Sequence, residues 1–98
     1  MTRQDIFTFI SENRDYLRSH FHIDTIGIFG SFARGDQSEE SDIDFLIEFE
    51  ENTQNLYELK AELRSYLSSH LRRRVDLAHP KYLKPFVRDE ILGEAVYG

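Results

Sequence analysis

An aspartate pair interrupts an apolar run in this 98-residue chain: Asp42 and Asp44 flank Ile43 where the run Ile43–Phe49 begins. Successive side chains of a strand point to opposite faces, so both carboxylates lie on one face while Ile43 and Phe45 lie on the other. Two neighbouring carboxylates repel each other, and burying an unpaired charge is costly. The chain must therefore bury one face of this strand and supply the other face with solvent or a cation.

The segment around this pair is acidic throughout. Between positions 36 and 59 the chain has nine carboxylates and no Lys or Arg, namely Asp36, Glu39, Glu40, Asp42, Asp44, Glu48, Glu50, Glu51 and Glu58. The net charge of −6 argues against a general nucleic-acid-binding protein, which presents a basic surface to phosphates. The absence of cysteine excludes a disulfide scaffold and a zinc site built on thiolates.

Length and polarity restrict the class of protein further. A chain of 98 residues predicts one domain over residues 1–98, and a hydrophobic content of 40% argues against intrinsic disorder. The N-terminal residues are polar, and no apolar run approaches the ~18 residues of a membrane span. We therefore expect a cytoplasmic protein with no signal peptide and no membrane contact.

The hydrophobic periodicity predicts a two-layer α/β fold in which helices flank a small mixed sheet. The expected order is helix, strand, turn, strand, helix, strand, helix. The predicted helices run from Thr2 to about Phe21, from Asn52 or Thr53 to about His70, and from Pro85 onward. The predicted strands are Ile23–Phe29, Ile43–Phe49 and Arg74–Ala78, and residues 31–35 form a helical turn closed by Gly35.

Two further features carry candidate chemistry. Gly30-Ser31 follows the first predicted strand, where a glycine lets the backbone approach a ligand and neighbouring amides can bind an anion. An ordinary turn would use the same two residues. Asp76 lies between Val75 and Leu77 in the third predicted strand, and such a carboxylate must be paired, coordinated or exposed.

Each acidic motif has a structural alternative. Asp42 and Asp44 would be solvated if their strand were at an edge of the sheet, and Asp76 would be neutralised by pairing with one of the arginines at 72–74. If the aspartate pair instead binds a metal, its oxygen ligands suit Mg²⁺ or Mn²⁺.

Considered together, these motifs resemble one enzyme family. The segments Ile28–Gly35, Ser41–Ile47 and Arg74–Leu77 combine Gly-Ser after a strand, Asp-x-Asp at the start of the next strand, and a third Asp in a later strand. This pattern resembles the DNA polymerase beta nucleotidyltransferase superfamily, specifically its minimal nucleotidyltransferases, the MNT-type antitoxins. The resemblance covers essentially the whole chain in order and length.

The resemblance implies a two-metal nucleotidyltransferase. Asp42 and Asp44 would hold two Mg²⁺ ions that clamp the triphosphate of ATP, and Asp76 would complete the site as a metal ligand or as the base for the acceptor hydroxyl. Gly30 and Ser31 would cradle the phosphates.

Two further residues each have two alternative roles in such a site. Arg34 would add a positive charge to the phosphates, or it is a helix-end cation that faces solvent or pairs with Asp36. Ser41 would orient Asp42, or it merely ends the loop.

The resemblance also implies a partner. Minimal nucleotidyltransferases are paired with a HEPN-domain ribonuclease toxin, so this chain would be the antitoxin that transfers AMP onto a toxin tyrosine within a hetero-oligomer. Residues 81–98 are the candidate contact region. The alternatives are an antitoxin that neutralises its toxin by binding alone, and an enzyme for a small acceptor such as an aminoglycoside.

The remaining polar side chains are interpreted as structural. The basic cluster Arg72-Arg73-Arg74 has no interleaved aromatic residues, so it indicates a surface loop, with a partner contact as the second choice. The four histidines are not spaced as metal ligands. Direct binding of nucleic acid is not expected.

Overall fold

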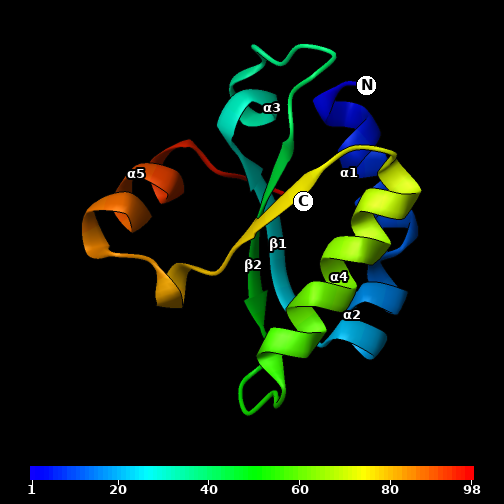
Figure 1. Cartoon of the computed structure of the whole chain (residues 1–98), viewed down its shortest axis with the longest axis vertical. Coiled ribbons are helices and arrows are strands. Elements are labelled where there is room, and N and C mark those ends of the chain that lie inside the picture. The colour runs from blue at the N-terminus through cyan, green and yellow to red at the C-terminus, as the bar shows by residue number, and fades with distance from the viewer.

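A computed structural model describes residues 1–98 and contains a four-stranded sheet with helices on both sides. Figure 1 shows α1, α2 and α4 on one side of the sheet and α5 on the other. The helices are α1 (Arg3–Glu12), α2 (Arg14–Phe21), α3 (Gly30–Arg34), α4 (Leu56–Leu71), the 3₁₀ turn η1 (Pro80–Tyr82) and α5 (Pro85–Glu94). The strands are β1 (Ile23–Phe29), β2 (Ile43–Phe49), β3 (Val75–Ala78) and β4 (Val96–Tyr97).

The sheet is mixed, as the sequence predicted. Its strand order is β3-β2-β1-β4, with β2 antiparallel to β1 and parallel to β3. The parallel crossover passes through α4, which packs on the face of the sheet that carries Ile43, Phe45 and Ile47. Because β2 lies between β1 and β3, the aspartate pair is not on an edge strand, and that alternative is wrong.

The core lies between the sheet and the helices α1, α2 and α4. It is formed by 17 buried apolar side chains, which include Ile6 and Ile10 of α1, Phe21 of α2 and Leu67 of α4. Each of these contacts follows from an amphipathic repeat that the sequence displays. No helix is both long and apolar enough to cross a membrane.

The predicted first helix is wrong in one respect, because it is two helices. Thr2 caps α1 through a capping box with Asp5, as expected, but the helix ends at Asn13. The Asn13 amide donates to the Phe9 carbonyl at 2.8 Å, and its oxygen accepts from the Tyr66 hydroxyl at 3.1 Å. A side chain that bonds the backbone locally competes with the helix, so the axis changes direction there.

One further helix boundary was predicted wrongly, and one strand was missed. The N-cap of α4 is Asn55, with φ 57°, because Thr53 is used in a preceding turn where its hydroxyl donates to the Glu50 carbonyl at 2.6 Å. The strand β4 was not predicted at all, and it pairs with β1 at Gly27 and Ile28. The Gly27 position requires glycine, since a Cβ there would lie 2.8 Å from the Val96 carbonyl oxygen.

Candidate active site

A hollow of about 520 Å³ opens where α3, the loop before β2 and α5 meet. Its lining contains most of the residues that the sequence singled out, namely Gly30, Ser31, Arg34, Ser41, Asp42 and Asp44. Asp76 does not line it. That carboxylate is exposed on β3, immediately beside the hollow, because β3 is the edge strand of the sheet.

The three aspartates gather on one face of the sheet. Asp44 of β2 is the register partner of Asp76 in the parallel neighbour β3. Asp42 precedes Asp44 by two residues and therefore shares its face. Burial of the Asp44 carboxyl, followed by the negative charges of Asp76 and Asp42, raises its pKa to about 6.

The carboxylates are oxygen ligands of the kind that hard divalent cations prefer, but their side chains do not converge on one metal position. No group of three or more His, Asp or Glu side chains is close enough to hold a metal ion. Asp42 instead pairs with Arg74, whose Nε lies 3.1 Å from Oδ1, and Asp76 faces solvent. Asp42 and Asp44 remain adjacent oxygen donors in a crowded acidic site, which fits Mg²⁺ or Mn²⁺ once Asp42 leaves Arg74.

Gly30 brings the backbone against the Asp44 carboxylate. It follows Phe29, the register partner of Asp44, and it has φ +71°, a conformation that favours glycine. A Cβ at position 30 would overlap the Asp44 carboxylate oxygen. The glycine is therefore required by a close approach, and it aims its own amide N–H into the hollow.

That amide already has a partner, which the sequence did not indicate. The Gly30 N–H donates to Oε1 of Glu94 at 3.0 Å, and Nη1 of Arg34 donates to Oε2 of the same carboxylate at 3.1 Å. Arg34 also pairs with Asp36 through Nε at 3.2 Å. Hydrogen bonds to Asp36 and Glu94 raise the pKa of the Arg34 guanidinium.

The loop between α3 and β2 is held by an arginine from the turn between α4 and β3. Nη1 of Arg73 donates to the carbonyls of Glu39 and Ser41 at 2.9 and 3.0 Å, and the guanidinium lies 5.4 Å from the centre of the Phe32 ring. The Ser41 hydroxyl accepts from the Ser38 N–H at 2.9 Å, so it is used within the loop. Arg73 thus holds the loop that leads to Asp42.

Sequence reasoning missed the roles of Glu94, Arg73 and Arg74. The arginines were interpreted as a surface loop with a partner contact as the second choice, whereas Arg73 and Arg74 bind the site loop and Asp42. The only available signal was that the acidic block required compensating cations. Glu94 gave no signal, because its contact to Gly30 spans 64 positions.

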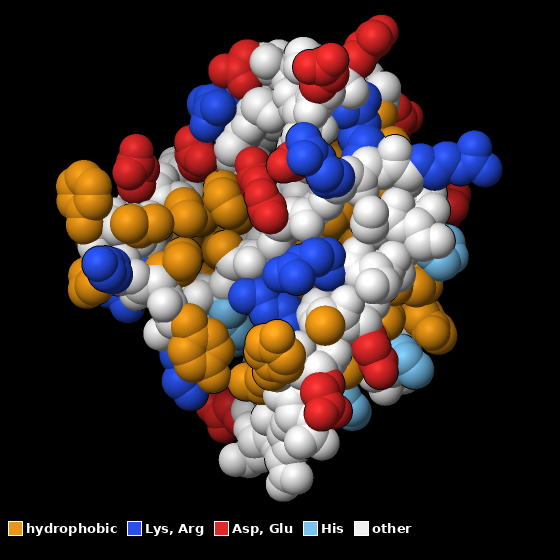
Figure 2. Space-filling view, viewed as in Figure 1, with side chains coloured by type: hydrophobic (Ala, Val, Ile, Leu, Met, Phe, Trp, Pro, Cys, Tyr) orange, Lys and Arg blue, Asp and Glu red, His pale blue; other side chains and the backbone are white.

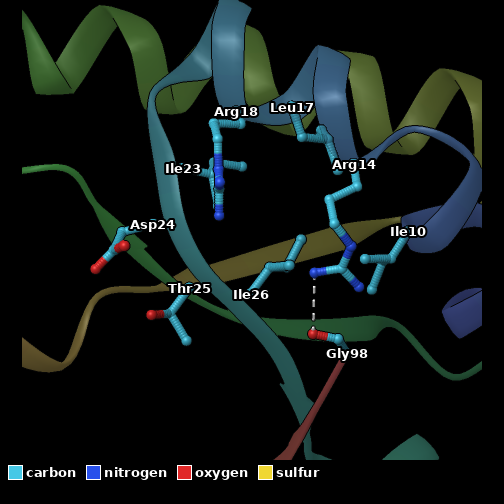
Figure 3. Close-up of a pocket in the computed structure, with 9 residues that line it drawn as sticks. All are labelled: Ile10, Arg14, Leu17, Arg18, Ile23, Asp24, Thr25, Ile26 and Gly98. Atoms are coloured by element: carbon cyan, nitrogen blue, oxygen red, sulfur yellow. Dashed lines mark hydrogen bonds between the residues drawn. The ribbon is translucent and has the colours of Figure 1, made fainter.

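A second hollow is unrelated to these carboxylates. Figure 3 shows it between α1, α2 and β1, where Arg14 points to the carbonyl of Gly98 at 3.5 Å. Its volume of about 90 Å³ is well below the ~300 Å³ at which ligand pockets begin.

Comparison with known proteins gives a consistent result. A family model described as a nucleotidyltransferase domain matches residues 10–97. The protein adenylyltransferase MntA of Thermococcus cleftensis is 37% identical over 97 residues, covering 99% of this chain and 96% of its own length. A Methanocaldococcus jannaschii protein assigned as a protein adenylyltransferase is 35% identical over 97 residues, covering 98% of this chain and 97% of its own.

Solved structures agree in fold. A structure assigned as a minimal nucleotidyltransferase superposes with a TM-score of 0.80 at 30% identity, covering 98% of this chain and 95% of its own. A toxin–antitoxin structure with AMP-PNP superposes with a TM-score of 0.68 at 22% identity, covering 99% of this chain and 72% of its own. The second likeness is one of fold alone.

Proposed function

The chain belongs to the nucleotidyltransferase domain family, and we propose that it is a Mg²⁺-dependent antitoxin that transfers AMP from ATP to a tyrosine of a HEPN ribonuclease toxin. The observation that carries this proposal is the meeting of Asp42, Asp44 and Asp76 on one sheet face beside the Gly30 amide. Carboxylates beside an oxyanion-binding amide are the components that nucleotidyl transfer requires.

Each residue has a distinct task in this proposal. Asp42 and Asp44 would hold Mg²⁺, which when bound neutralises the triphosphate and stabilises the charge that develops at the α-phosphorus. The Gly30 amide and the Arg34 guanidinium bind phosphate oxygens, and Ser31 lines the same end of the hollow. Asp76 is exposed at the sheet edge, where a hydroxyl carried by another protein can reach it.

The proposed reaction is balanced without a further reactant. The tyrosine oxygen forms a bond to the α-phosphorus of ATP, and the bond from the α-phosphorus to the bridging oxygen breaks. Pyrophosphate leaves with the bonding pair. The tyrosine proton passes to the Asp76 carboxylate and then to solvent.

A protein acceptor is supported by the surface next to the site. Figure 2 shows hydrophobic side chains gathered over α5 and the segment before it. Phe86 is 80% exposed and Tyr82 63% exposed, and Val87 and Leu92 are exposed beside them. Exposed apolar clusters mark protein contacts. We therefore assign residues 81–98 to the contact with the toxin.

The direct test is transfer of radiolabel from α-³²P-ATP to the toxin encoded beside this chain, with Mg²⁺ present. We expect the wild type to label the toxin from α-³²P-ATP and not from γ-³²P-ATP, because the β- and γ-phosphates leave. Asp44→Asn removes a metal-binding charge and should abolish labelling. Asp24→Asn is the matched control, since Asp24 is an exposed aspartate of β1 outside the hollow.

Other outcomes contradict the proposal in different ways. A tight complex with no labelling, and protection that survives Asp44→Asn, would show an antitoxin that acts by binding alone. Labelling of an aminoglycoside without any protein partner would show a small-molecule enzyme.

The role of Asp76 has its own test. If it accepts the proton, Asp76→Asn should lose the acidic limb of the pH–rate profile while nucleotide binding is kept. An unchanged profile with weaker Mg²⁺ binding would assign Asp76 to the metal alone.

A further inference from the structure

One carboxylate in the hollow is bound where a substrate oxyanion is needed. Glu94 is the last residue of α5, and its two oxygens accept separately from the Gly30 amide at 3.0 Å and from the Arg34 guanidinium at 3.1 Å. These are the two donors that the proposed function gives to the phosphates of ATP. Both are therefore engaged by the protein itself.

A carboxylate is a close chemical substitute for a phosphate edge. Both present two oxygens to N–H donors, and both form short charge-assisted hydrogen bonds with a guanidinium. An amide N–H has one hydrogen, so the Gly30 amide cannot serve Glu94 and a phosphate at full strength together. Glu94 and a phosphate therefore compete for the Gly30 amide.

Electrostatic repulsion also disfavours the presence of Glu94 and a phosphate at this position together. Carboxylates outnumber arginines in the lining, where Glu90 and Glu94 of α5 face Asp42 and Asp44. Arg34 is shared between Asp36 and Glu94, so its charge is already neutralised. A triphosphate that entered beside a bound Glu94 would meet repulsion with little compensation.

Helix α5 contributes no buried side chain, so Glu94 can move away from Gly30 without unpacking a buried residue of its own helix. None of the α5 side chains is buried, and its N-cap residue Lys84 makes no side-chain capping bond. The helix is followed by Ala95 in an extended conformation and by the two-residue strand β4. Movement of α5 would thus open no part of the main core, which lies on the other face of the sheet.

We propose that Glu94 occupies the phosphate position of the nucleotide site in the free protein, and that ATP must displace it, so that α5 acts as a latch. This inference rests on the proposed function in one respect, namely that the hollow binds a nucleoside triphosphate. It predicts that Glu94 opposes nucleotide binding, whereas a metal ligand or a catalytic residue at this position would favour it.

The test compares ATP binding to the full chain by isothermal titration calorimetry at a fixed Mg²⁺ concentration. Glu94→Gln removes the charge with little change of shape and should lower the Kd for ATP about tenfold, the factor expected from losing a competing charge-assisted contact. Glu94→Ala is the second variant and should act in the same direction. Glu90→Gln is the matched control, because Glu90 lines the hollow without a hydrogen bond to Gly30 or Arg34.

Glu90→Gln measures the general effect of removing one negative charge, and we expect it to change the Kd less than about threefold. Equal tightening in Glu94→Gln and Glu90→Gln would overturn the latch. Weaker binding in Glu94→Gln would also overturn it, and would make Glu94 a residue that holds the ligand.

Amide hydrogen exchange gives a second readout. ATP with Mg²⁺ should speed exchange in residues 85–94 of the wild type, and Glu94→Gln should show the fast exchange before ATP is added. Slower exchange there on ATP binding to the wild type would refute displacement. If neither the wild type nor any variant bound ATP, the proposed function would fail and the latch with it, whereas tight wild-type binding unaltered by Glu94→Gln would refute the latch alone.

Discussion

Replacement of Asp44 by Asn should stabilise the free protein at neutral and alkaline pH while it abolishes transfer. Burial of the Asp44 carboxyl, with the charges of Asp76 and Asp42 beside it, raises its pKa from 3.8 to about 6. The folded-state pKa is above the unfolded value, so folding favours the protonated carboxyl. Its contribution to stability is therefore greatest below pH 3.8 and is lost as the pH rises to about 6.

The magnitude follows from this shift. About two pKa units correspond to ~3 kcal/mol at 1.36 kcal/mol per unit. The Asp44 side chain is only half-buried, and solvent screening reduces the net penalty to roughly 1 kcal/mol. Asparagine has the shape of the protonated carboxyl without its charge. Asp44→Asn should thus unfold with a free energy roughly 1 kcal/mol higher than the wild type near pH 8, and nearly equal to it near pH 4.

Urea denaturation followed by far-UV circular dichroism measures this difference. Asp24→Asn, an exposed aspartate of the same sheet, controls for the loss of one carboxylate and should change the unfolding free energy by less than about 0.5 kcal/mol. Millimolar MgCl₂ should stabilise the wild type and leave Asp44→Asn unchanged, because ligand binding to the folded state adds to stability. A variant no more stable than the wild type near pH 8, or one equally stabilised at both pH values, would refute the argument.

Two further perturbations test the backbone and the loop. Gly30→Ala should abolish ATP binding and lower the unfolding free energy by about 1–3 kcal/mol, because its Cβ would overlap Asp44 at a positive φ. Gly93→Ala is the control in the same calorimetric titration and should bind ATP normally, because a Cβ at position 93 meets nothing within 4 Å. Arg73→Ala should cost about 1–3 kcal/mol and speed proteolysis of residues 36–42, since the loop carbonyls lose a charged donor. The exposed Arg64→Ala should do neither, and equal proteolysis in both variants would contradict the role of Arg73.

The main elements of the fold could be predicted from local patterns. A nearly continuous apolar run identified β2, the short run that ends before His79-Pro80 identified β3, and Pro85 at the first turn identified the start of α5. The prediction failed where a side chain made a contact that periodicity cannot describe. Asn13 falls on the helical stripe, yet its amide binds Phe9 and Tyr66 and divides the helix. Strand β4 was missed because two residues carry no periodic signal.

Only part of the site could be predicted, again because sequence patterns describe local geometry and not long-range contacts. Asp42 and Asp44 reach one face because strand geometry requires it, and the pattern Gly-Ser then Asp-x-Asp is local in sequence. Arg73 and Arg74 reach the site from the turn between α4 and β3, through contacts to Ser41 and Asp42. Their charges were visible in the sequence, but their partners depended on where the crossover returned.

The sequence by itself determined which face of β2 is apolar and packs in the core, which face carries the aspartates, and where the glycine turn after β1 lies. These properties depend on neighbours one to four positions apart, where backbone geometry leaves few choices. Only the tertiary structure decided that Asp76 lies beside Asp44, that β2 is central, and that Glu94 binds the Gly30 amide. Such contacts join residues tens of positions apart, and they form only after the whole chain has packed around its core.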